Sequence, residues 1–190
     1  MLTHQMTRRR FLQTGGALIV GFGLAGPLEA VRAQTTGART KTVASDEVDA
    51  FLAIGKDGRV TVYTGKVDLG TGTGTALPQF VTEELDVPLG RIVLVEGDTA
   101  LVPDQGPTWG SLTIQAAGIQ LRQAAATARR ALLELAAGRL GVPPSALVVA
   151  DGVVRSQGDA SRTVSYGELI GDGEFHLKLD PKAPLKPPST

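Results

Sequence analysis

Cysteine is absent from this 190-residue chain, and histidine occurs only twice. Without cysteine the protein forms no disulfides and offers no thiolate to a metal ion. His4 and His176 lie near opposite ends of the sequence, and we expect both to be incidental because neither has a partner for a triad or a metal site. The sequence therefore predicts no catalytic residue and no protein metal ligand.

Aromatic residues are scarce, at 4%, and the formal net charge is zero. The charge is unevenly placed, since Arg8, Arg9, Arg10 and Arg32 face a single acid, Glu29, in the first 33 residues. The remaining residues carry about −3. Binding of nucleic acid requires a basic surface, so we expect no nucleic-acid partner.

Long apolar runs are also missing, and residues 15–28 are about half as long as a membrane-spanning helix requires. We therefore expect no permanent membrane span. This run follows Arg8-Arg9-Arg10-Phe11-Leu12 and precedes the small-residue ending Val31-Arg32-Ala33. The pattern predicts a twin-arginine signal peptide over residues 1–33 and a periplasmic protein. Residues 34–47 are polar and aperiodic, which indicates a flexible leader.

Local patterns predict the elements of the folded part. Two hairpins are expected, at residues 51–63 around Asp57-Gly58 and at residues 147–155 around Asp151-Gly152. Helical spacing is expected at residues 76–85, 114–140 and 165–170, and a strand at residues 92–95. Alanines and Gly118 predict a close approach of the long helix to a sheet.

These elements predict an α+β fold, with a small mixed β-sheet and β-hairpins packed by one long and one shorter helix. Residues 48–178 would form one partial domain. Residues 179–190 are rich in proline and predict an extended linker to a missing downstream domain, so that the chain would be a fragment.

Two glycine-rich loops are the candidate binding site: residues 70–75, with Gly70, Thr71 and Gly72, and residues 106–111, with Thr108, Gly110 and Ser111. Each precedes a predicted helix, whose N-terminal amides favour anions. Neither loop has the spacing of a P-loop or a dinucleotide-binding turn. We expect the backbone amides of both loops to face one phosphate-bearing ligand.

Other polar residues near these loops have plainer interpretations. Glu83, Glu84 and Asp86 are expected to form a solvated helical face, and Asp98 and Asp104 to cap turns. Trp109 could stack on a flat ring or pack as a lid on the core.

Several motifs occur in an order that resembles the molybdopterin-binding large subunit of the xanthine dehydrogenase and aldehyde oxidase family, and within it the exported branch typified by the isoquinoline 1-oxidoreductase beta chain. They are residues 62–72, 83–88, 97–99, 103–111 and 121–126. The resemblance extends from about Phe51 to the end of the chain.

The resemblance implies a molybdenum hydroxylase that oxidises an aldehyde or N-heterocycle with oxygen from water. The cofactor would be molybdopterin, in its cytosine dinucleotide form, and electrons would pass to a small [2Fe-2S] subunit and then to a cytochrome c subunit. Gly70, Thr71, Gly72, Thr108, Gly110 and Ser111 would bind the cofactor. Many family members have glutamine at the position of Thr71, and the family's catalytic glutamate would lie beyond this chain, so we expect the fragment to be inactive alone.

Two alternatives remain open at this point. One is a stand-alone exported module that binds a nucleotide or phosphate without catalysis. The other is a structural or adhesive β-rich exported protein.

Overall fold

The computed structural model describes residues 44–171 and 176–187, all of which belong to one compact unit, residues 39–190. The predicted signal peptide and nearly all of the predicted leader lie outside the described residues. Within the described part, none of the helices combines the length and apolar character needed to cross a membrane.

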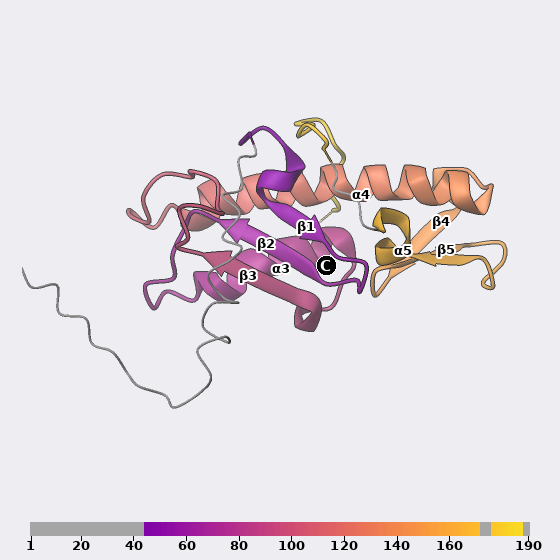
Figure 1. Cartoon of the computed structure of the whole chain (residues 1–190), viewed down its shortest axis with the longest axis horizontal. Coiled ribbons are helices and arrows are strands. Elements are labelled where there is room, and N and C mark those ends of the chain that lie inside the picture. The colour runs from indigo at the N-terminus through magenta and orange to yellow at the C-terminus, as the bar shows by residue number, and fades with distance from the viewer. Residues whose placement is uncertain (1–43, 172–175, 188–190) are drawn as a thin grey trace, which may run out of the picture. The chain divides into compact units, whose positions relative to one another are not determined.

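The first sheet joins a hairpin to a parallel strand (Figure 1). Strands β1 (Leu52–Ile54) and β2 (Val60–Thr64) are antiparallel, and β3 (Ile92–Glu96) lies parallel to β2. A parallel neighbour requires a crossover, which helix α3 (Thr73–Leu85) provides. The carboxyl ends of β2 and β3 consequently lie at the same edge of the sheet.

The second sheet is an antiparallel meander of β4 (Leu147–Ala150), β5 (Val153–Ser156) and β6 (Thr163–Ser165). Helix α5 (Tyr166–Ile170) follows β6 directly, with Ser165 and Glu168 forming a capping box. The predicted α+β class is confirmed, with the strands divided between two small sheets.

Helix α4 (Ile119–Leu140) runs past both sheets (Figure 1) and ends at Gly141, which has a left-handed backbone. The residues before it, Ile114–Gly118, form a π-helix where the sequence predicts regular helix. A Cβ atom on Gly118 would lie 2.9 Å from Cε2 of Phe80 in α3. The prediction that Gly118 approaches a sheet was therefore wrong, because this glycine allows a helix to approach another helix.

The hydrophobic core lies between α4, α3 and the two sheets, and small side chains allow the close packing on α4. Fully or nearly fully buried residues include Phe51, Leu52, Val60, Val62, Leu77, Val81, Leu85, Leu121, Ala124, Ala125, Ala128, Leu132, Val154 and Tyr166. Short 3-10 turns, Val48–Ala50, Leu89–Arg91 and Pro144–Ala146, lead into the strands.

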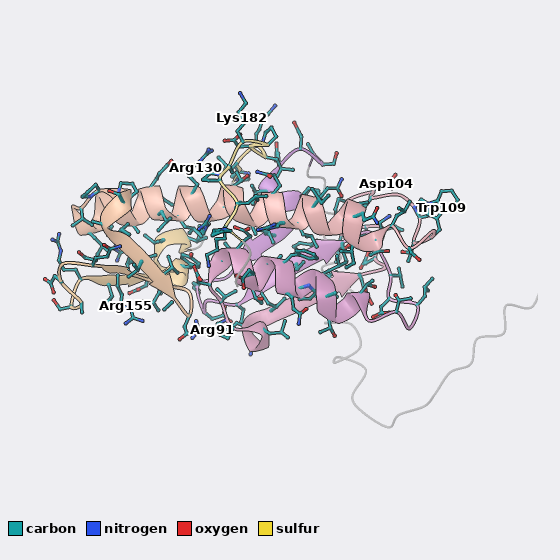
Figure 2. All side chains as sticks on the ribbon, turned by 180° about the vertical axis from the view of Figure 1, so that it is seen from behind. Arg91, Asp104, Trp109, Arg130, Arg155 and Lys182 are labelled. Carbon is teal, nitrogen blue, oxygen red and sulfur yellow. The ribbon has the colours of Figure 1, made fainter. Side chains whose placement is uncertain are left out.

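The proline-rich C-terminal segment packs against the helices along its described part, residues 176–187. Arg122 and Arg129 of α4 donate to the carbonyl oxygens of Lys186 and Pro184, at 2.6 and 2.8 Å, and Ala183 is buried. Figure 2 shows Lys182 and Arg130 on the same side of the molecule, where Arg130 forms an ion pair with Asp180. The segment is extended, as predicted, but it is held to the helices rather than free.

Candidate functional site

The loops that follow β2 and β3 are joined by hydrogen bonds at the shared edge of the sheet. The Thr64 hydroxyl and the Gly65 N–H both donate to Oε1 of Gln105, at 2.7 and 2.9 Å. Val67 N–H donates to the Thr108 hydroxyl at 3.0 Å. In open α/β sheets, ligands bind beyond the carboxyl ends of the strands, so this edge is a favourable place for a site.

Lys66 fixes the second loop through its side chain. That side chain is buried, and Nζ donates to the carbonyl oxygens of Gly106 and Pro107, at 3.1 and 2.8 Å. A lysine beside a glycine loop would ordinarily suggest a phosphate ligand, but this ammonium binds protein carbonyls. Its role is to hold the second loop in position.

The amides of the first loop bind a carboxylate of the chain itself. Asp68 Oδ1 accepts from the N–H groups of Gly70, Thr71 and Gly72, at 2.9, 2.8 and 3.2 Å, and Oδ2 accepts from Gly74 at 2.9 Å. These backbone hydrogen bonds, with that from Gly74 the largest effect, lower the pKa of Asp68. The prediction that these amides face a ligand was wrong, because Asp68 already occupies the helix N-terminus.

Side chains of both loops instead line one pocket of about 340 Å³. Its walls are Leu69, Thr71, Thr73, Thr108, Trp109, Gly110, Ser111, Thr113 and Ile114. Four of the six predicted site residues belong to this wall, whereas Gly70 and Gly72 do not. The pocket therefore presents hydroxyl groups and apolar carbon, where the sequence predicted backbone amides.

The second loop keeps its shape through left-handed residues and a short turn. Gly110 and Ser111 have φ values of 59° and 57°, and the latter is unusual for a residue with a side chain. Asp104 accepts from Gly106 N–H, and Asp98 from Ala100 N–H, both at 2.9 Å, so the predicted turn caps are confirmed. Trp109 is 69% exposed, so it does not pack on the core.

Thr73, the first residue of α3, was not predicted as a site residue. Its side chain is buried and its hydroxyl has no hydrogen-bond partner among the described residues. The alternating Gly-Thr pattern gave no signal to single it out from Thr71 and Thr75. Asp68, Lys66 and Gln105 were missed for the same reason, since their partners are set by the folding of the two loops.

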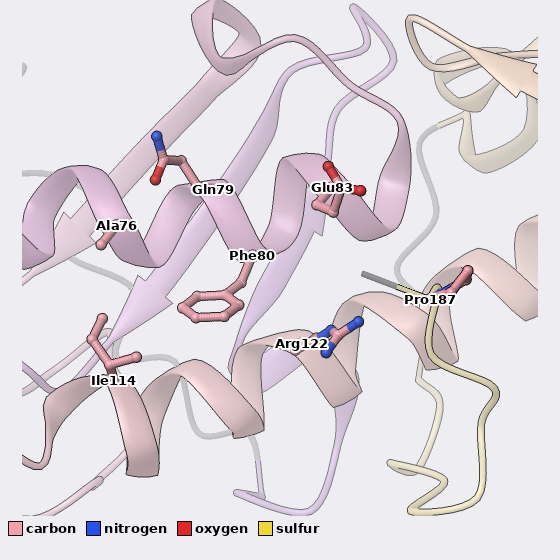
Figure 3. Close-up of a pocket in the computed structure, with 7 residues that line it drawn as sticks. All are labelled: Ala76, Gln79, Phe80, Glu83, Ile114, Arg122 and Pro187. Carbon is pink, nitrogen blue, oxygen red and sulfur yellow. The ribbon is translucent and has the colours of Figure 1, made fainter. Parts of the chain in front are cut away.

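A second cavity, of about 480 Å³, lies between α3 and the start of α4 (Figure 3). It is lined by Ala76, Gln79, Phe80, Glu83, Ile114, Arg122 and Pro187. Arg122, its cation, is already hydrogen-bonded to Glu84 and Lys186. This cavity offers a ligand mainly apolar contacts, so the pocket between the loops is the better candidate site.

The acidic cluster of α3 is only partly solvated. Glu83 is exposed, but Glu84 is completely buried and contacts the guanidinium groups of Arg122 and Arg129, at 2.8 and 3.6 Å. It also accepts from Lys186 N–H at 3.1 Å. The predicted solvated face was wrong for Glu84, which joins α3, α4 and the C-terminal segment.

Among residues 44–171 and 176–187 there is no group of three or more potential metal ligands of the histidine, cysteine, aspartate or glutamate type. His176 donates its backbone N–H to Asp49 at 2.7 Å, and His4 lies outside the described residues. A metal bound at the candidate site would have to arrive within a larger cofactor.

A family model, the molybdopterin cofactor-binding domain, matches residues 4–182. The large chain of nicotinate dehydrogenase from Pseudomonas putida is 46% identical over 77% of this chain, which covers 12% of that protein. The beta chain of isoquinoline 1-oxidoreductase from Brevundimonas diminuta is 33% identical over 88% of this chain, which covers 22% of that protein. The chain thus spans less than a quarter of the length of these relatives.

The CO dehydrogenase of Oligotropha carboxidovorans, a solved structure, has a similar fold. It matches with a TM-score of 0.57 and 27% identity over 63% of this chain and 15% of its own. Quinoline 2-oxidoreductase from Pseudomonas putida 86 matches with a TM-score of 0.50 and 25% identity, over 63% of this chain and 15% of its own.

Proposed function

Because the chain belongs to the molybdopterin cofactor-binding domain family, within the xanthine oxidase family of molybdenum enzymes, we propose that it forms one part of the cofactor-binding subunit of a molybdenum hydroxylase. The observation that carries this proposal is the convergence of both glycine-rich loops on one pocket at the carboxyl ends of β2 and β3. The complete enzyme requires further chain, since the relatives are more than four times as long as this one's matched region.

The residues of the pocket fit part of a molybdopterin cofactor. Thr71, Thr73, Thr108 and Ser111 carry hydroxyls for its polar atoms, while Trp109 offers an aromatic face for a flat ring. A pocket of 340 Å³ is at the small end of the range for small-molecule sites, which is expected if other segments complete it. When bound, the cofactor supplies a two-electron oxidation that uses oxygen from water. The residues of this chain bind and orient it.

We propose an aldehyde or an N-heterocycle as the substrate. Two relatives are named for nicotinate and isoquinoline, which supports a heterocycle, and the molybdenum-binding chain of an aldehyde oxidoreductase from Escherichia coli is 29% identical over 84% of this chain. The same proposal includes the cytosine dinucleotide form of the cofactor, a small [2Fe-2S] subunit and a cytochrome c subunit as the route for electrons.

The experiment for this function is analysis of the complete subunit, purified with its partner subunits from its native host. We expect about one molybdenum atom and one pterin per subunit, and cytidine monophosphate after acid hydrolysis. A complex with neither molybdenum nor pterin would refute the function. Release of guanosine monophosphate would contradict only the cytosine form.

Export through the twin-arginine pathway is a separate part of the proposal, supported by Arg8, Arg9 and Arg10 before a short apolar run. Replacing Arg8 and Arg9 together by lysine should retain the unprocessed protein in the cytoplasm, as measured by cell fractionation. Arg32→Lys, which leaves the arginine motif intact, is the control. Unchanged periplasmic yield in the double variant would contradict this route.

The phosphate-binding module without catalysis is the weaker alternative. The amides expected to bind phosphate in the first loop are taken by Asp68, whose negative charge would repel an anion at the same helix end. No observation on the described residues favours this alternative over the molybdenum cofactor.

A further inference from the structure

Thr73 presents a buried polar atom to the pocket between the two loops. The residue lines this pocket and is only 8% exposed. Its hydroxyl is fully shielded from solvent and has no hydrogen-bond partner among the described residues. Buried hydroxyls are nearly always hydrogen-bonded, because an unmade bond leaves the desolvation of the group uncompensated.

The groups around Thr73 have other partners. The N–H groups of Thr71, Gly72 and Gly74 donate to Asp68, and those of Thr75 and Ala76 donate to the Gly72 carbonyl. Across the pocket, the Thr108 hydroxyl accepts from Val67. A ligand in the pocket is therefore the partner best placed for the Thr73 hydroxyl.

We propose that the Thr73 hydroxyl is a hydrogen-bonding contact for the ligand of this pocket. This assignment rests on the proposed function, under which the contact is made to a polar atom of the molybdopterin cofactor. Asp68 then has a supporting role: by binding the loop amides it fixes the N-terminus of α3, and so holds Thr73 in the pocket wall. The side chain, and not the glycine backbone, binds the cofactor at this helix.

The substitution Thr73→Val tests the assignment, because valine has nearly the same shape as threonine and lacks only the hydrogen-bonding group. In the complete subunit within its native complex, we expect Thr73→Val to lose pterin and molybdenum about tenfold faster during incubation in mild denaturant. Pterin is followed by its fluorescence after oxidation and molybdenum by elemental analysis. Thr73→Ser, which keeps the hydroxyl, should lose cofactor at close to the wild-type rate.

Thr75→Val is the matched control, since Thr75 lies two residues further along the same helix, is exposed and does not line the pocket. It should release cofactor at the wild-type rate. A second measurement separates binding from folding: in cells that make no molybdopterin, cofactor-free Thr73→Val should unfold at the same temperature as wild type or higher, because it removes an unsatisfied buried hydroxyl.

Equal rates of cofactor loss in wild type and Thr73→Val would overturn the assignment. A clearly lower unfolding temperature of the cofactor-free variant would also overturn it, by indicating a structural role. A wild-type complex that holds neither pterin nor molybdenum would refute the proposed function, and the assignment of Thr73 with it.

Discussion

At Gly65 the chain has room for a hydrogen atom and nothing larger. A Cβ atom there would lie 2.3 Å from the Pro103 carbonyl oxygen and 3.1 Å from the Gln105 nitrogen. Both neighbours are backbone atoms of the second loop, so the clash cannot be relieved by rotating a side chain. The close approach at this residue is what allows Gln105 to bond across the two loops.

We therefore expect Gly65→Ala to reduce the free energy of unfolding by about 1–3 kcal/mol, as measured by urea titration. It should also weaken cofactor binding, because the pocket walls separate. Gly138→Ala is the control: this glycine lies in α4 with nothing near its Cβ position, so alanine should stabilise the protein by about 1 kcal/mol. If both variants behaved alike, the loops would not depend on this contact.

At the scale of elements, Glu84 connects three segments that are distant in sequence. Its carboxylate is fully buried between Arg122 and Arg129 of α4 and the backbone of Lys186. A buried carboxylate that loses its charge leaves both guanidinium groups without their partner, and one-sided removal is far more costly than loss of a surface pair.

Glu84→Gln should lower the free energy of unfolding by about 3 kcal/mol and release the C-terminal segment from the helices. Faster proteolysis near Lys182 and Lys186 would report the release. The comparison is Glu134→Gln, which removes an exposed pair with Arg130 at 3.9 Å and should change stability by less than about 0.5 kcal/mol. A small effect of Glu84→Gln, similar to that of Glu134→Gln, would contradict this role.

At the scale of the whole molecule, acid should destabilise the fold through carboxylates in several separate turns. Hydrogen bonds lower the pKa of Asp68, Asp159, Glu168 and Asp180, to which Gly74, Ser161, Ser165 and Lys182 respectively make the largest contribution. A folded-state pKa below the unfolded value contributes stability that is complete above the unfolded pKa, about 4. That stability is lost as the pH falls through the lower, folded pKa.

The midpoint of urea unfolding should therefore change little on this account between pH 7 and pH 5, and fall below about pH 4. Asp68→Asn should flatten part of the acid limb, because asparagine does not titrate. A wild-type midpoint that is the same at pH 3 as at pH 7 would contradict this account.

Local sequence patterns predicted the elements because their causes are local. The Asp-Gly turns produced both hairpins, and Gly141 ended the long helix in the predicted left-handed conformation. The order of motifs also predicted the family, which the match over residues 4–182 confirms. The ligand contacts of Gly70, Thr71, Gly72, Thr108, Gly110 and Ser111 stay predictions.

The tertiary structure alone decided which groups face the pocket. Asp68 is two residues from Gly70, yet only the fold of the loop shows its carboxylate taking the amides that the sequence offered to a ligand. Glu83 and Glu84 are adjacent and chemically equivalent, and the packing of α3 on α4 exposes one and buries the other. Composition and periodicity determined the elements and the family, because these depend on near neighbours. Hydrogen-bond partners depend on distances between segments far apart in sequence, and those distances exist only in the folded chain.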